Sequence, residues 1–211
     1  MSYAFVSSTS SATTKTGFVI AAGQQVFVLA TDQSAINSTL TLSDGTNTYV
    51  SLGTINDTRD TATYTLLACL NPTPGTYTLT LSGATSGLMF QSLYTGLASI
   101  SVGSFQSFFS GAFPPTTTDG CATAAITPTS YPAAILAFGQ VFGTLSAGTG
   151  FTLRSTQNSN PSFSLEDLEL TSGSHIASYT MATGGTDVTI LAVAVIESSS
   201  GAGAAPIAWI T

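Results

Sequence analysis

Only three residues of this 211-residue chain are cationic, and this scarcity is the strongest constraint on its fold. They are Lys15, Arg59 and Arg154. Exposed helix faces are normally filled with Lys, Arg, Glu, Gln and Ala, so a chain with 6% charged residues lacks the side chains for surface helices. Ser and Thr are abundant instead, and with the 20 glycines they favour strands and turns. The sequence predicts an all-β protein with no substantial helix.

The same scarcity bears on the partners of the chain. A net charge of -7 with three cations excludes the basic patches that bind nucleic acid or anionic membrane surfaces. The longest apolar run, residues 188–196, is about half of the roughly 18 residues that a spanning helix needs. The amino terminus also lacks the cationic and apolar regions of a secretory signal. We therefore expect a soluble protein that binds no nucleic acid and does not insert into membranes.

Short apolar or alternating segments recur along the chain and predict about ten strands. Residues 25–30 form a near-continuous apolar run, which is typical of a strand covered on both faces. In residues 77–82, Tyr77, Leu79 and Leu81 alternate with threonines and should point into the core. The other predicted strands are 39–43, 46–52, 64–70, 88–94, 133–142, 151–154, 163–170, 176–181 and 188–196.

Two local features predict irregular backbone. Asp44 and Gly45 separate strands 39–43 and 46–52, which predicts a tight hairpin because these residues tolerate positive φ. In strand 163–170 the apolar parity shifts between Leu165 and Leu168. One extra residue at Glu166 and Asp167 would produce that shift, so we predict a β-bulge there.

The strand pattern favours one antiparallel β-sandwich, with a jelly roll preferred at this length. We expect a flexible or partner-docked segment at 1–16, the sandwich at 17–197, and a linker with an apolar tail at 198–211. The segments at 23–27 and 139–142 look faintly alike. Their likeness is either coincidence or a pseudo-symmetry of two Greek keys, and we do not take it to indicate two domains.

Catalytic residues are scarce, and we predict that the chain is not an enzyme. The only histidine is His175, which a strand would place on the same face as Ala177 and Tyr179, near a turn. Asp57 and Asp60 flank an arginine in a loop, where turn capping is the favoured interpretation over acid/base work. No triad can be proposed from these residues.

No cofactor or metal is expected either. Glu166, Asp167 and Glu169 are the densest acidic group, but they lack the spacing of a calcium loop, and Glu169 should face water. Cys69 and Cys121 form either one disulfide or two buried thiols, and the sequence favours free thiols without deciding the matter.

Aromatic residues and the carboxyl terminus are the remaining candidates for binding. Glycan sites on β-sandwiches use exposed aromatic platforms, although most tyrosines of alternating strands are core residues with a hydrated hydroxyl. The available aromatic residues are Trp209, Tyr3, Tyr49, Tyr94 and Tyr131. The tail residues Pro206, Ile207, Trp209 and Ile210 follow a Ser/Gly/Ala linker. This tail either adds a strand to its own sandwich or docks onto a neighbouring subunit, and we single it out as an assembly element.

Three segments carry a family resemblance: residues 41–49 (TLSDGTNTY), 150–154 (GFTLR) and 164–167 (SLED). In this order they resemble the strand-turn motifs of Ser/Thr-rich jelly-roll modules in bacterial surface proteins and phage structural proteins. The likeness spans roughly residues 17 to 197. The family commonly has Trp where this chain has Phe151. The resemblance implies a fold rather than an activity, and no catalytic residue is carried over from it.

These observations lead to one expected function and one alternative. The first is a non-catalytic structural protein of a virion, such as a phage head decoration or a fibre or tail subunit, whose partners are other protein subunits. The alternative is an extracellular or cell-surface carbohydrate-binding or adhesin module that binds glycans. A hydrolase is the weakest hypothesis, because ionisable residues are few.

Overall fold

The computed structural model describes residues 3–110, 121–157, 161–181 and 186–198. Within these residues all regular structure is β-strand, and every strand pair is antiparallel. The predicted all-β, antiparallel fold is therefore confirmed. The described part holds seventeen strands rather than about ten, because several strands are short or rich in Ser and Thr and give no apolar signal.

The strands fall into two runs along the chain. The first run is β1 (Ala4–Ser11), β2 (Thr14–Ile20), β3 (Gln24–Asp32), β4 (Thr41–Ser43), β5 (Val50–Asp57), β6 (Ala62–Cys69), β7 (Gly75–Ser82) and β8 (Gly87–Thr95). The second run is β9 (Leu97–Ile100), β10 (Gln106–Ser110), β11 (Cys121–Ile126), β12 (Ala133–Phe142), β13 (Leu145–Ala147), β14 (Thr152–Gln157), β15 (Ser162–Leu170), β16 (His175–Met181) and β17 (Thr186–Glu197).

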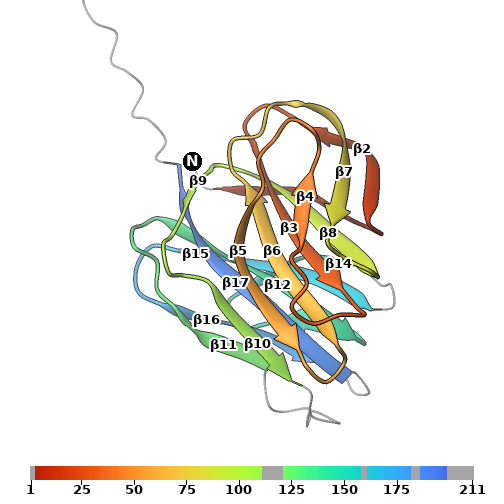
Figure 1. Ribbon diagram of the computed structural model, residues 1–211. Helices are drawn as coiled ribbons and strands as arrows, with labels where there is room; N and C mark the ends of the chain where they lie inside the picture. The colour runs from red at the N-terminus through yellow and green to blue at the C-terminus, as the bar shows by residue number, and fades with distance from the viewer. Residues whose placement is uncertain (1–2, 111–120, 158–160, 182–185, 199–211) are drawn as a thin grey trace, which may run out of the picture.

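The strands form four sheets, which we call A to D and which stack in the order B, A, C, D. Sheet A has the strand order β1-β8-β3-β6-β5, and sheet B has the strand order β2-β7-β4. Sheet C has the order β10-β17-β12-β15-β14, with β9 also paired to β17, and sheet D the order β11-β16-β13. One hydrophobic core lies between B and A, a second between A and C, and a third between C and D. Figure 1 shows the layers, with β2 and β7 at one end of the stack and β11 and β16 at the other.

The inner sheets are buried on both faces, which explains the apolar runs of their central strands. In β3, Phe27 and Leu29 face sheet C, while Val26 and Val28 face sheet B. The prediction for residues 25–30 is therefore confirmed. The outer sheet B has one buried face, and on β7 Leu79 and Leu81 are buried while the threonines between them are exposed, as predicted.

The strand order of the first run recurs in the second. Replacing β1 through β8 by β10 through β17 converts sheet A into sheet C and sheet B into sheet D. This order is consistent with a jelly roll in each half. The similar segments 23–27 and 139–142 do not occupy corresponding places, since the first begins β3 and the second ends β12. Their likeness is therefore coincidental, although the repeat of the strand order is real.

The hairpin predicted at Asp44 and Gly45 is wrong. Gly45 does adopt a positive φ of 80°, but β4 pairs with β7 in sheet B, whereas β5 pairs with β6 in sheet A. The Asp44 carboxylate accepts hydrogen bonds from the N–H groups of Thr46 and Asn47 and from the hydroxyl of Tyr49. These bonds stabilise a longer loop that carries the chain from one sheet to the other.

The bulge predicted at Glu166 and Asp167 is also misplaced. The pairing of β15 with β12 runs without interruption through both residues. The extra residue is Arg154 in the neighbouring edge strand β14. The parity shift in β15 has another cause: Leu165 belongs to the core between A and C, and Leu168 packs against the core between C and D.

The amino-terminal segment differs from the expected boundary at residue 17. Residues 4–11 form edge strand β1 of sheet A, and β2 of sheet B begins at Thr14. The Ser/Thr-rich composition resembled a linker because β1 lies at a sheet edge, where few of its side chains need to be apolar. The predicted tail at 198–211 lies outside the described residues from residue 199 onward.

Candidate functional site

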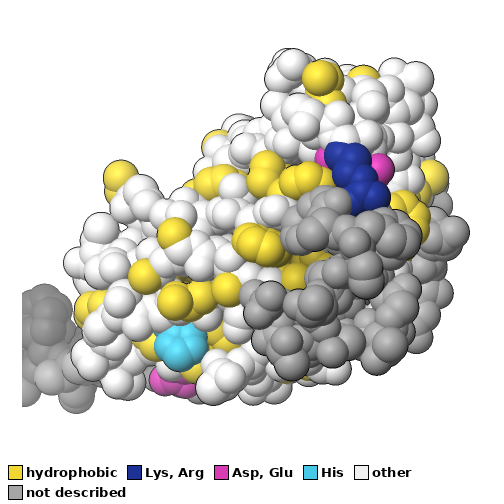
Figure 2. Space-filling view, turned by 90° about the horizontal axis from the view of Figure 1, so that it is seen from below, with side chains coloured by type: hydrophobic (Ala, Val, Ile, Leu, Met, Phe, Trp, Pro, Cys, Tyr) yellow, Lys and Arg dark blue, Asp and Glu magenta, His cyan; other side chains and the backbone are white. Residues whose placement is uncertain are grey.

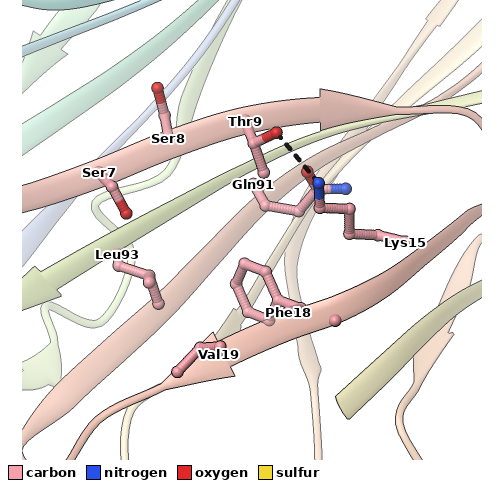
Figure 3. Close-up of a pocket in the computed structure, with 9 residues that line it drawn as sticks. Ser7, Ser8, Thr9, Lys15, Phe18, Val19, Gln91 and Leu93 are labelled. Atoms are coloured by element: carbon pink, nitrogen blue, oxygen red, sulfur yellow. Dashed lines mark hydrogen bonds between the residues drawn. The ribbon is translucent and has the colours of Figure 1, made fainter. Parts of the chain in front are cut away.

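An open groove lies where the edge strand of sheet A meets the edge strand of sheet B. It has a volume of about 230 Å³. In Figure 3, β1 and β2 run in opposite directions along its two sides. The lining residues are Ser7, Ser8, Thr9, Lys15, Gly17, Phe18, Val19, Gln91 and Leu93.

The groove combines apolar and hydroxyl-bearing surface. Phe18 and Leu93 belong to the core between A and B, and their side chains point toward the groove (Figure 3). Val19 is 59% exposed at its rim. Lys15 Nζ donates to Thr9 Oγ1 at 3.5 Å, which links the two strands at one end. Such a surface suits a peptide with apolar side chains.

Bulges limit how a partner can pair with these edges. β1 has its irregularity at Val6, and β2 has one extra residue between Lys15 and Phe18, with Gly17 at φ 66°. Bulges blunt sheet edges against continuous strand addition. Contact at the groove therefore depends on side chains as much as on backbone pairing. The corresponding strands of the second half, β10 and β11, pack closely against each other, whereas β1 and β2 make little direct contact.

A polar cluster of buried Tyr3, Tyr94 and Asp167 with a partly exposed Arg154 lies where β1 of sheet A meets β14 of sheet C. Arg154 Nε is 2.9 Å from both carboxylate oxygens of Asp167, which is 1% exposed. The hydroxyl of Tyr94 donates to Asp167 Oδ2 at 3.0 Å. Tyr3 lies against the same pair. A cavity of about 310 Å³ opens here, lined by Tyr3, Gly150, Thr152, Arg154, Asp167, Leu168 and Glu169.

Burial and the negative charge of Asp167 both raise the pKa values of the two tyrosines in this cluster. Burial raises the pKa of Tyr94 well above its usual range, and the negative charge of Asp167 adds to the effect. Burial and Asp167 also raise the pKa of Tyr3. The hydrogen bond to Asp167 raises the pKa of Arg154. Both tyrosines are therefore neutral hydrogen-bond donors at physiological pH, beside a paired and cationic Arg154.

Glu166 is adjacent in the chain but points into the core between sheets C and D. It is fully buried, and its Oε2 accepts the N–H of Gly148 at 2.8 Å. Its Oε1 has no hydrogen-bond partner among the described residues. Burial raises the pKa of Glu166 from 4.5 to about 8. The two consecutive acids of β15 therefore point to opposite faces of sheet C, Glu166 toward sheet D and Asp167 toward sheet A.

The other acidic candidates follow the expected structural roles. Asp57 Oδ1 accepts the N–H groups of Arg59 and Asp60 at 2.8 and 3.1 Å, so turn capping is confirmed. Glu169 is exposed, as predicted. Within the described ranges, no three His, Cys, Asp or Glu side chains are grouped so that they could hold a metal ion. That part of the chain also contains no helix able to cross a membrane.

His175 contacts the ring of Phe151 and the backbone of Thr149. His175 begins β16, its ring lies 5.6 Å from that of Phe151, and its Nε2 is 3.2 Å from the Thr149 carbonyl oxygen. In Figure 2 it is the cyan side chain on a face that is otherwise largely uncharged.

Cys69 and Cys121 are free and buried, in the B–A and C–D cores respectively, so the preference for free thiols is confirmed.

The aromatic candidates do not assemble into one surface. Tyr3 and Tyr94 are buried, Tyr49 is half-buried, and Tyr131 is 37% exposed with its hydroxyl donating to the Gly173 carbonyl oxygen. Trp209 lies outside the described residues, as do Pro206, Ile207 and Ile210 of the predicted assembly tail.

Neither the groove nor the polar cluster was predicted from the sequence. Tyr3, Tyr94 and Asp167 were candidates for other roles, but their convergence depends on contacts between distant strands. One signal was present: Arg154, one of three cations, lies in a strand segment that could be expected to approach the acids of 163–170.

Comparisons with protein-family models, curated proteins and solved structures gave no match to this chain. Functional inference therefore rests on the residues and geometry of the molecule itself.

Proposed function

We propose that this chain is a non-catalytic structural protein that acts through protein–protein contacts in a particle or surface assembly. The observation that carries this proposal is the open groove between edge strands β1 and β2, where Val19 is 59% exposed at the rim. Exposed apolar side chains at a concave edge are typical of interaction surfaces. Other protein subunits, identical or different, are the expected partners.

The outer faces of the stack support the same proposal. On sheet B, Thr76, Thr78 and Thr80 form an exposed row on β7, and on sheet D Ile176 and Thr180 are exposed on β16. Faces with hydroxyl and apolar groups but few charges can be packed against neighbours without the cost of burying unpaired charge. A phage particle, with this chain as head decoration or as fibre or tail subunit, is our specific proposal. The jelly-roll order, which occurs in viral capsid and lectin domains, is consistent with it.

The test is the mass of the protein by light scattering over a range of concentrations. We expect the full chain to associate, and we expect Val19→Asp to weaken association because it places a charge at the groove rim. Val102→Asp is the matched control, since Val102 is 85% exposed in the connection between β9 and β10, away from the groove. A chain truncated after Glu197 tests the tail as the associating segment. A full-length protein that is monomeric throughout would refute self-assembly.

A second candidate, a carbohydrate-binding or adhesin module, is favoured by the polar cavity beside Arg154 and Asp167. A binding module needs a site with fixed donors and acceptors, and this cavity has them.

A further inference from the structure

Strands β1–β8 and β10–β17 repeat the same strand order, so residues of the first half can be compared with the residues at equivalent positions of the second half. In β5, Leu52 is an extra residue between Ser51 and Gly53, opposite Leu67 and Leu66. In β14, Arg154 is an extra residue between Leu153 and Ser155, opposite Glu166 and Leu165. The same bulge at the same place fixes the register between the halves.

This register assigns an apolar counterpart to three members of the polar cluster. Arg154 corresponds to Leu52, and Asp167 corresponds to Ala68, since each precedes the bulge by one ladder pair. Through the pairing of β3 with β6 and β8, and of β12 with β15 and β17, Tyr94 corresponds to Val195. All three counterparts belong to or pack against the core between sheets A and C.

The counterparts lie together at the opposite seam of the same two sheets. Strand β1 contacts β14 at the polar seam, and β10 contacts β5 at the other. There the ring of Phe105 packs on Gly53, where an added Cβ would lie 2.3 Å from the ring. One seam is therefore apolar, whereas the other is polar and holds a cavity of about 310 Å³.

The fold does not require polar residues at this seam, because the equivalent seam is formed by the apolar residues Leu52, Ala68 and Val195. Only the Asp167 carboxylate of this ion pair is buried, since the Arg154 side chain is 34% exposed, and removing a carboxylate from water costs free energy unless it is paired and hydrogen-bonded. Asp167 is 1% exposed, and its charge is compensated by Arg154, Tyr94 and Tyr3. A costly arrangement beside a cavity, absent from the equivalent seam, indicates a role other than folding.

We propose that the polar seam binds a neutral polyhydroxylated ligand, such as one sugar residue of a glycan. Hydroxyl groups both donate and accept, and the cavity offers the Arg154 guanidinium as donor, the Glu169 carboxylate as acceptor and the Thr152 hydroxyl as either. Glu169 and Asp167 disfavour an anion, and Arg154 disfavours a cation. The volume lies at the lower end of small-molecule sites, which fits a single ring. This inference deepens and rests on the second candidate function, a carbohydrate-binding module, and it does not depend on the proposed assembly role.

The test uses saturation-transfer NMR with glucose, galactose, mannose and N-acetylglucosamine at millimolar concentrations. We expect transfer from the wild-type protein to at least one sugar. The double variant Arg154→Leu with Asp167→Ala installs the apolar pair of the opposite seam, and it should stay folded and lose the signal. Thr152→Val keeps the ion pair and should weaken binding about tenfold, the effect of one lost hydrogen bond.

Three results would overturn the proposal. No transfer to any of the four sugars would exclude the ligand class. Transfer that persists in both variants would place binding elsewhere. A double variant that loses its cooperative unfolding transition would show that the cluster is required for folding, contrary to the comparison of the two seams. Because Val19→Asp leaves this seam untouched, failure of assembly and failure of sugar binding are distinguishable.

Discussion

The substitution Glu166→Gln should change how the stability of this protein depends on pH. Glu166 is fully buried between sheets C and D, and burial raises its pKa to about 8, although the N–H groups of Gly148 and Ser178 oppose the rise. The unfolded chain has the ordinary value of 4.5. Between these values the native state holds a proton that the unfolded state has released, so stability falls as pH rises through this range.

The magnitude follows from the two pKa values. Each unit of difference corresponds to about 1.4 kcal/mol, so a shift from 4.5 to about 8 implies a loss of up to about 5 kcal/mol across the range. The glutamine side chain of the Glu166→Gln variant does not titrate and keeps an acceptor for the Gly148 N–H, so the variant should lack this loss. Its advantage over the wild type should be small near pH 5 and reach several kcal/mol near pH 9.

Urea denaturation at a series of pH values measures the difference directly. Glu169→Gln is the matched control, since Glu169 is exposed on the same strand, and its curve should follow the wild type. Burial also raises the pKa of Glu197, and the charge of Glu169 adds to the rise, so this group cancels between the wild type and Glu166→Gln and differs only in the Glu169→Gln control. Wild type and Glu166→Gln with parallel stability profiles between pH 5 and 9 would refute the assigned protonation.

Three further substitutions test the packing, each by the urea midpoint at neutral pH. Phe138→Ala should cost about 3–5 kcal/mol, because Phe138 is fully buried between sheets A and C. Asp32→Ala should cost at least about 3 kcal/mol, since its carboxylate accepts bonds from Ser34, Ser38, Thr85 and Ser86, and their donors would lose a buried partner. Gly83→Ala should destabilise strongly, because φ is 84° and the new Cβ would lie 2.0 Å from a backbone oxygen. Wild-type midpoints would contradict these assignments.

Alternation and apolar runs predicted the strands of the inner sheets well. The predicted range 133–142 coincides with β12, and 163–170 lies within β15. These strands carry strong signals because both of their faces are buried and most of their side chains are apolar. The strands that were missed lie at sheet edges and need few apolar side chains; they are β1, β2, β9, β10, β11 and β13.

Sheet assignment was beyond the reach of local patterns. Asp44 and Gly45 mark a real turn, yet the strands on either side belong to different sheets. A tight hairpin and a crossover between layers begin with the same residues, and the difference depends on which core each strand joins. We predicted one two-layer sandwich, whereas the structure has four layers, for the same reason. A period-2 pattern shows that one face of a strand is buried, but it does not show which sheet covers that face.

The polar cluster illustrates a further gap between sequence and site. At corresponding positions of the two halves, Leu67 and Ala68 are replaced by Glu166 and Asp167. Consecutive side chains of a strand point to opposite faces, and both acids are buried because β15 lies between two cores. Glu166 joins sheet C to the N–H of Gly148 beside sheet D, whereas Asp167 holds Arg154 at the cavity. The first half has Ala68 at the position of Asp167, so the ligand that we propose for the cavity would account for the charge of Asp167, whereas Glu166 does not line that cavity.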